Sequence, residues 1–374
     1  MKKKLAIIGA SLGQEPLLLK AKKMGIETYC FAWEKSAEYK HLADLFYPIS
    51  VLEKEQILDV CKEVQIDGIV TMSSDICVPA VCYIAEKMNL IGNNYESALI
   101  STNKYLMRQA FSKNGVNIPR FTIVENNECD VMGFTYPLIV KPTDRLASIG
   151  VTKVEKEEDL KDAIELAKKL SYEKKAIVEE FIQGSEVLEV MCISWKGKHY
   201  PFAIEDSENM ENTSFFKAGF FFPADLDDAV RQQACTQTKL ALDALHFEYG
   251  ASDVEIIIGN DGKVYIVEVN PRMAGEMEYL MVELSTGYDF LKGAINIALN
   301  QFEEPTFFPV IKYSGLYYLR PETEYLRPVI ENWKNDPDIK EAVIFDEKDV
   351  VLERLGYLVY QSDRRRSWKP NHLI

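Results

Sequence analysis

Several features that define other classes of protein are scarce in this sequence. Its seven cysteines include no CxxC pair, and an odd number of scattered thiols is not the disulfide framework of a small secreted domain. Basic residues are outnumbered, 43 against 58 acidic ones, and the formal charge of -15 argues against a nucleic-acid partner. No apolar run is long enough to cross a membrane, and the first one is broken at Gly9 and Gln14. We therefore expect a cytoplasmic protein without membrane partners.

The composition is that of a folded protein with more than one domain. The chain has 374 residues, of which 47% are hydrophobic and 27% are charged. A single hydrophobic core stops growing near about 250 residues, so we expect two or three domains. If an acidic chain of this kind binds a polyphosphate, its lysines must be concentrated at that site.

The first hundred residues alternate between apolar runs and helical patterns. A short buried strand is followed by a helix and a second strand, and the alternation then continues. This pattern predicts a doubly wound α/β domain over residues 1–100. The expected strands are residues 4–9, 27–31 and 68–71, and the expected helices are residues 16–23, 54–64 and 78–88.

The middle of the chain mixes strands and helices without regular alternation, which predicts an α+β domain over residues 101–304. Pro305 and Pro309 mark a second boundary, before a small C-terminal lobe at residues 305–374. Strands are expected at residues 138–141, 150–154, 176–180, 187–194, 252–258, 264–269, 315–320, 341–345 and 357–361, and helices at residues 157–170, 226–244 and 288–299.

The segment Gly9–Gly13, which reads GASLG, fits two motifs without being specific for either. As a hydrolase nucleophile elbow it lacks a convincing late histidine, because only His246 and His372 follow. As a dinucleotide loop it lacks a second glycine at the required spacing, and the next strand ends at Phe31 rather than at an acid. We expect these glycines to permit a tight turn between strand and helix.

Lys141 ends a predicted strand and is followed by a loop of small residues, 143–151. Such a loop lets backbone N–H groups approach a phosphate, and the lysine adds a positive charge. An edge-strand lysine before an ordinary turn remains an alternative. The predicted strand at 176–180 ends in two glutamates, which alone are typical of a solvated strand end.

Two neighbouring predicted strands place acidic side chains among apolar ones. Glu255 lies in the first, and Glu268 and Asn270 lie two residues apart in the second, so the latter two point the same way. Charges in apolar strands are costly unless they are paired or bind metal, and this oxygen set suits Mg²⁺. Arg272 follows on the same face, where it can hold a phosphoryl group. A polar strand face on an exposed sheet is the alternative.

Together these motifs resemble the ATP-grasp superfamily, of the carboxylate–amine ligase type, which includes L-amino acid ligases and proteins related to carbamoyl-phosphate synthase and biotin carboxylase. The resemblance covers most of the chain. It implies a pre-ATP-grasp domain, an ATP-grasp fold of two α+β subdomains and a C-terminal lobe. Two departures concern Ala147, where many members have glycine, and Asn103, where aspartate is common.

The resemblance also implies roles for individual residues. ATP would be contacted by Lys104, Lys141, Ser148, Gly150, Glu179, Glu180, Phe181, Ile182 and Glu186. One or two Mg²⁺ ions, or Mn²⁺, would be held by Glu255, Glu268 and Asn270, and Arg272 would be the catalytic residue that steadies the γ-phosphoryl group.

The reaction implied is activation of a carboxylate as an acyl phosphate, followed by attack of an amine to form an amide. Dipeptide-type ligation is the leading subtype. Residues 205–223 have two interpretations, a loop that faces the substrate and an acidic surface loop capped by core phenylalanines. Activation of bicarbonate and ligation in a purine pathway are the nearest alternatives. A nicotinamide-dependent oxidoreductase and a non-catalytic nucleotide-binding protein are more distant ones. The partners expected are small carboxylates and amines, and a homodimer would be unsurprising.

Overall fold

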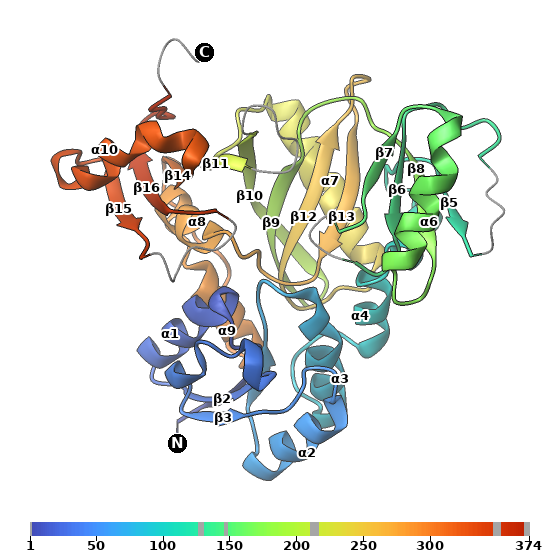
Figure 1. Cartoon of the computed structure of the whole chain (residues 1–374). Helices are drawn as coiled ribbons and strands as arrows, with labels where there is room; N and C mark the ends of the chain where they lie inside the picture. Colours follow the sequence, from blue (N-terminus) through green and yellow to red (C-terminus); the bar gives the residue numbers. More distant parts are fainter. Residues whose placement is uncertain (1, 126–130, 146–148, 210–216, 347–352, 370–374) are drawn as a thin grey trace.

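The computed structural model describes residues 2–125, 131–145, 149–209, 217–346 and 353–369, whose strands form three sheets. Figure 1 shows the N-terminal sheet beneath a long central sheet, with a small sheet at one side of it. No helix among the described residues is long and apolar enough to cross a membrane. The α-helices are α1 (Glu15–Lys23), α2 (Lys54–Val64), α3 (Val78–Met88), α4 (Tyr95–Ser101), α5 (Lys104–Lys113), α6 (Leu160–Leu170), α7 (Asp228–Ala244), α8 (Glu278–Thr286), α9 (Phe290–Ala298) and α10 (Arg327–Glu331).

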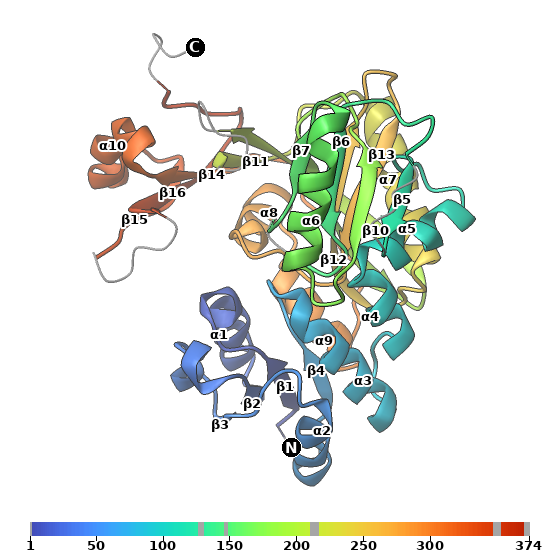
Figure 2. The same ribbon diagram turned by 45° about the vertical axis from the view of Figure 1, so that its right-hand side comes forward.

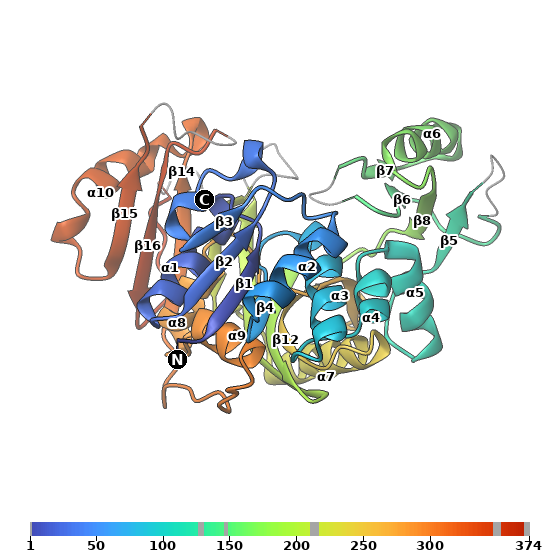
Figure 3. The ribbon, with the colours of Figure 1, turned by 90° about the horizontal axis from the view of Figure 1, so that it is seen from below.

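The N-terminal sheet is parallel and is covered on both faces, as the doubly wound prediction requires. Leu5 and Ile7 of β1 pack in one cluster with side chains of α1 and α9, whereas Ala6 and Ile8 pack with side chains of α2 and α3. Figure 3 shows the four strands side by side in the order β3-β2-β1-β4. They are β1 (Lys4–Ile8), β2 (Glu27–Phe31), β3 (Leu45–Tyr47) and β4 (Gly68–Val70).

Two helices, α4 and α5, connect this sheet to the rest of the chain. Helix α5 begins directly after Asn103, whose side-chain oxygen accepts hydrogen bonds from the backbone N–H groups of Tyr105 and Leu106. Asparagine therefore caps this helix as well as an aspartate would, which accounts for the departure at this position.

The small sheet is antiparallel and has one helix packed on it. Apolar side chains of α6, among them Ile164 and Ala167, pack against Val140 and Val178 of the sheet. Figure 2 shows α6 and this sheet beside the β12–β13 edge of the central sheet. The strands, in the order β5-β8-β6-β7, are β5 (Phe121–Val124), β8 (Ala176–Glu180), β6 (Leu138–Pro142) and β7 (Thr152–Val154).

The central sheet has eight strands, and β9 shows how its two faces are used. Val190 and Cys192 pack with α7, whereas Met191 and Ile193 point to the opposite face and pack with α8 and α9. The strands, in the order β13-β12-β9-β10-β11-β14-β16-β15, are β13 (Val264–Asn270), β12 (Gly250–Ile258), β9 (Leu188–Trp195), β10 (Lys198–Asn209), β11 (Lys217–Phe222), β14 (Tyr313–Leu319), β16 (Gly356–Ser362) and β15 (Ile339–Ile344).

Both sequence interpretations of residues 205–223 as a loop are wrong for the described part of that segment. Residues 205–209 belong to β10 and residues 217–222 to β11, and the two strands pair in antiparallel fashion. Glu205 is buried, and so are Phe221 and Phe222. The segment was misread because its run of acidic residues is typical of a surface loop. In the structure these acidic and aromatic residues lie in strands, and several of them are buried.

The C-terminal strands do not form a sheet of their own. β14 pairs with β11, so β14, β16 and β15 continue the central sheet beyond the strands that carry the predicted site. Helix α9 also returns to the N-terminal sheet, where it packs beside β4. Contacts of this kind between distant segments give no periodic signal in a sequence.

Candidate active site

The three predicted metal ligands lie together on β12 and β13. Glu255 and Glu268 are directly opposite one another in the register of these antiparallel strands, and Asp253 is opposite Asn270. The side-chain nitrogen of Asn270 donates a hydrogen bond to Asp253 Oδ2 at 3.1 Å, which leaves the amide oxygen of Asn270 as its ligand atom. Directly opposed side chains are the closest neighbours across a sheet, so the arrangement forms one oxygen cluster.

The donors of this cluster fit a divalent cation. Burial raises the pKa of Glu255 to about 7, and the carboxylates of Glu268 and Asp253 add to that shift. Burial and the neighbouring negative charges both disfavour an ionised Glu255, and a bound cation would offset both effects. Carboxylate and amide oxygens are the ligands that Mg²⁺ and Mn²⁺ accept.

Two lysines reach the same region from different elements. Lys104, at the start of α5, donates to Glu268 Oε1 at 2.5 Å. Lys141, at the end of β6, lies 2.8 Å from Glu179 Oε2, and Arg108 Nε donates to the other oxygen of Glu179 at 2.6 Å. Burial alone would raise the pKa of Glu179, but Arg108 and Lys141 outweigh it and lower the pKa to about 2.

Glu179 therefore has a different setting from the one expected. We predicted it among the residues that line a nucleotide, yet its carboxylate is buried between Lys141 and Arg108. Its side chain orients the lysine. Arg108, which was not singled out from the sequence, also donates from Nη2 to the backbone oxygen of Val267 at 2.6 Å, and so ties α5 to β13.

Arg272 is held by two carboxylates that the sequence analysis missed. Its Nε lies 2.9 Å from Asp75 Oδ1, and its Nη1 lies 3.6 Å from Asp253 Oδ2. The sequence contained a signal for Asp253, because this residue lies two positions before Glu255 and so faces the same side of β12. The sequence contained no signal that would place Asp75 near Arg272, because Asp75 belongs to the distant N-terminal domain.

A pocket lies where the small sheet meets the central one, and three predicted residues line it. Glu180, Phe181 and Ile182 share its wall with Tyr136 and Tyr265. This segment approaches β12 closely, because Gly184 forms a bridge with Gly259, and a Cβ at Gly184 would lie 2.0 Å from the backbone oxygen of Ile258. Only glycine fits there.

The remaining predicted nucleotide contacts are more scattered. Glu186 is exposed, and its Oε2 lies 3.8 Å from Lys217 Nζ. Gly150 has a φ of 77°, the left-handed conformation that favours glycine in a loop. Ser148 lies outside the described residues, as does Ala147.

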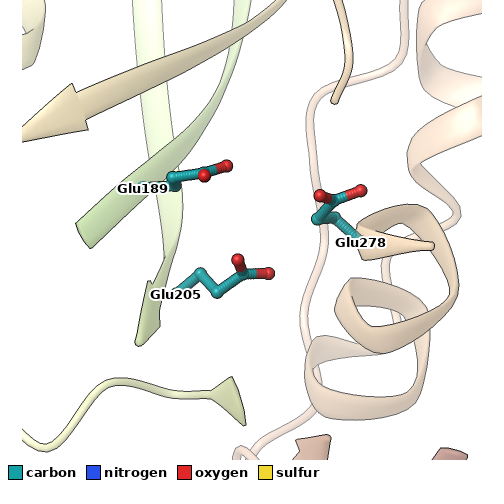
Figure 4. Close-up of side chains that lie close together, drawn as sticks. All are labelled: Glu189, Glu205 and Glu278. Atoms are coloured by element: carbon teal, nitrogen blue, oxygen red, sulfur yellow. The ribbon is translucent and has the colours of Figure 1, made fainter. Parts of the chain in front are cut away.

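Three further carboxylates converge beside this site. One oxygen each of Glu189, Glu205 and Glu278 lies within 4.8 Å of the others. Figure 4 shows the first two pointing from neighbouring strands toward Glu278, at the start of a helix. Burial raises the pKa of all three groups, and that of Glu278 reaches about 8 with a further contribution from Glu276. The sequence analysis did not single out Glu189 or Glu278.

The C-terminal part of the chain contacts Glu276, which lies two residues before Glu278. Arg354 Nη2 lies 2.7 Å from Glu276 Oε2, and the Tyr318 hydroxyl donates to the same oxygen at 2.5 Å. The Arg354 guanidinium also lies over the Tyr318 ring, 4.1 Å from its centre. Glu276 thus links the segment after β13 to the C-terminal strands.

The glycine turn at the N-terminus is filled by its own side chains. The Gln14 side chain accepts hydrogen bonds from Ser11 N at 3.0 Å and from Ser11 Oγ at 2.8 Å, and it donates to the backbone oxygen of Met72 at 2.6 Å. A Cβ at Gly9 would lie 2.7 Å from Gln14. A phosphate would have to displace this glutamine, so the turn is structural, as we expected.

Comparison with known proteins agrees with this architecture. Residues 134–279 match the family model described as an ATP-grasp domain. Alanine–anticapsin ligase of Bacillus amyloliquefaciens is 26% identical over 286 residues, which are 67% of this chain and 60% of that protein. The chain thus spans about 60% of the length of this relative.

Solved structures match nearly the whole chain. Phosphoribosylglycinamide synthetase from Anaerococcus prevotii has a TM-score of 0.78 and 24% identity, with 97% of this chain and 95% of that one covered. L-amino acid ligase from Bacillus licheniformis has a TM-score of 0.79 and 22% identity, with 97% and 94% covered. Residues 134–279 therefore match an ATP-grasp domain, and the chain as a whole shares the fold of these two solved structures.

Proposed function

We propose that this chain is an ATP-dependent carboxylate–amine ligase. A carboxylate oxygen attacks the γ-phosphorus of ATP, which gives an acyl phosphate and ADP. An amine then attacks the acyl carbon, phosphate leaves, and an amide forms. The observation that carries the proposal is the convergence of Lys104, Glu255, Glu268 and Asn270 beside Arg272, a set that serves phosphoryl transfer and contains no nucleophile.

We assign the nucleotide to the junction between the small and central sheets. Lys104 and Lys141 neutralise its phosphates, and Glu179 holds Lys141 in place. Glu180, Phe181 and Ile182 line the pocket that would take the base, and the exposed Glu186 would reach the ribose hydroxyls. Gly150 would belong to the loop over the phosphates, and the role expected for Ser148, which lies outside the described residues, stays a prediction.

Glu255, Glu268 and Asn270 would hold Mg²⁺ or Mn²⁺. When bound, the ion neutralises charge on the β- and γ-phosphate oxygens. Lys104 also pairs with Glu268, one of these three residues. Arg272 donates hydrogen bonds to the γ-phosphoryl group as it moves, and Asp75 and Asp253 fix the guanidinium for that task.

We infer that the carboxylate and the amine are small molecules, with amino acids as the leading class. Two kinds of protein to which the chain is similar bear names that point this way, an alanine–anticapsin ligase and an L-amino acid ligase. The converging carboxylates of Glu205 and its neighbours supply the negative charge that an amino acid's ammonium group requires.

ADP release tests this proposal. The protein is mixed with ATP, Mg²⁺ and amino acids or small carboxylates, singly and in pairs, with Arg272→Met as the inactive control. ADP release that requires a specific pair, together with an amide product, supports the ligase. ADP release with bicarbonate alone would instead favour a carboxylase, and the absence of any stimulated release would contradict the proposal.

A further inference from the structure

A row of four glutamates crosses the central sheet from one strand to the next. The register places Glu268 opposite Glu255, Glu255 opposite Glu189, and Glu189 opposite Glu205, on β13, β12, β9 and β10 in turn. Residues opposite one another in a sheet point to the same face, so all four carboxylates share one side. The first two belong to the proposed metal site, and the other two lie outside it.

Glu189 and Glu205, the two glutamates outside the proposed metal site, have no ion pair with a lysine or arginine of the described residues. Like charges opposite one another destabilise a sheet, and buried charges are costly unless they are paired. Lys104 pairs with Glu268, but no lysine or arginine of the described ranges forms an ion pair with Glu189, Glu205 or Glu278. Glu205 and Glu278 are 1% and 2% exposed, and each has an oxygen without a hydrogen-bond partner.

A fourth carboxylate, outside this triad, is also left unsatisfied. Asp253 is 2% exposed, its Oδ2 is occupied by Asn270, and its Oδ1 has no hydrogen-bond partner. It lies in electrostatic reach of Glu189, Glu205 and Glu278, and its Oδ2 lies 3.6 Å from Arg272 Nη1. Glu189 is partly buried, whereas Glu205 and Glu278 are buried.

The spacing of the three oxygens fits an ammonium group. Three oxygens that accept from the tetrahedral N–H groups of a primary ammonium nitrogen, each at about 2.8 Å, lie about 4.6 Å apart. The oxygens of Glu189, Glu205 and Glu278 lie within 4.8 Å of one another. An ammonium group also offers three donors to three acceptors.

We propose that Glu189, Glu205 and Glu278 form a subsite for the primary ammonium group of the substrate whose carboxylate is phosphorylated, which makes that substrate an amino acid with an unsubstituted amine. This inference rests on the proposed ligase function. Neighbouring strands are about 4.8 Å apart, and Glu189 is one strand from Glu255. An amino acid held by its nitrogen in the triad therefore presents its carboxylate toward the metal ligands and Arg272.

The test isolates the carboxylate substrate by using hydroxylamine as the amine. Hydroxamate formation is measured with ATP and Mg²⁺ for L-alanine against propanoate, and for L-methionine against 4-(methylthio)butanoate. We expect kcat/KM to favour the amino acid about 100-fold or more. Glu205→Gln and Glu278→Gln keep the side-chain shape, and each should reduce this preference about 10-fold or more, mainly through KM for the amino acid. Glu304→Gln, an exposed residue, should leave it unchanged.

The outcomes separate this inference from the ligase proposal. Equal use of an amino acid and its desamino analogue, or an unchanged preference in both variants, overturns the subsite. Restoration of both variants by higher Mn²⁺ also overturns it, in favour of a metal site. If no hydroxamate forms, the ligase proposal fails. Calorimetric binding of the same compounds then decides: a preference lost in Glu205→Gln supports the subsite, and equal binding overturns it. Thermal unfolding and MgADP binding verify that the variants are folded.

Discussion

Asp75 and Arg272 are paired across the junction between the N-terminal sheet and the ATP-grasp domain. Arg272 Nε lies 2.9 Å from Asp75 Oδ1, and Nη2 lies 3.1 Å from Oδ2. The two segments also meet through their backbones, because Ser73 N donates to Met273 O at 2.9 Å. The N-terminal domain thus orients the arginine that we place at the γ-phosphoryl group.

Asp75→Asn should therefore impair catalysis more than nucleotide binding. Breaking one side of a buried pair costs about 3 kcal/mol, and a misplaced guanidinium should lower kcat about 10-fold or more, with little change in KM for ATP. Steady-state kinetics and urea unfolding measure the two effects. Glu34→Gln, which breaks the exposed pair with Lys40, is the control and should cost less than about 1 kcal/mol. An unchanged kcat would show that Arg272 does not need Asp75 for its role in catalysis.

Glu268→Gln should abolish turnover while nucleotide still binds weakly. The change removes a charged metal ligand and the partner of Lys104, but leaves Lys141 in place. We expect ADP release to fall about 100-fold or more, with MgADP binding weakened but measurable by calorimetry. Glu303→Gln, at an exposed pair with Lys292, should behave like the wild type. Full activity of Glu268→Gln would rule out the metal assignment.

Lys141→Ala should act chiefly on the nucleotide. Its ammonium group is buried and is oriented by Glu179, so its loss removes a fixed positive charge from the phosphate site. KM for ATP should rise about 10-fold, and KM for the acceptor should change less. The opposite pattern would show that the lysine serves the acceptor. Lys156→Ala, at an exposed lysine paired with Glu158, is the control.

Glu179→Gln should change the acid stability of the protein. The pKa of Glu179 is about 2 in the folded state, below its ordinary value of 4.5, so the stability it contributes is present above pH 4.5 and is lost as the pH falls toward 2. The variant should be less stable than the wild type by about 3 kcal/mol at pH 6. That difference should shrink between about pH 4.5 and pH 2, as chemical unfolding at several pH values will measure.

Glu278→Gln should change the pH dependence of stability in the opposite direction. The pKa of Glu278 is raised to about 8, so its contribution to stability is lost as the pH rises from 4.5 through 8. Thermal unfolding in a chelator, without substrates, should show the wild type losing stability between pH 6 and pH 9. The variant should lose less over this range. Equal slopes for the two proteins would show that Glu278 is ionised at neutral pH in the free protein.

Local sequence patterns determined much of this protein. The continuous apolar run in residues 4–9, followed by a helix and a second strand, predicted a doubly wound sheet, because a strand that is apolar on both sides must be covered on both faces. The period of two along a strand placed Glu268 and Asn270 on one face of β13. Lys141 could be recognised at a strand end because the small residues after it follow immediately in the chain.

Tertiary structure decided what the chain brings together from a distance. Asp75 meets Arg272 across 197 residues, and the Glu179 carboxylate is paired with Lys141 and Arg108. The glutamate triad comes from β9, β10 and the start of α8, and residues 205–209 lie in a strand where we expected a loop. Periodicity reports which face of an element is apolar, but strand order and register depend on packing between elements. Only the folded sheet could therefore align four glutamates in one row.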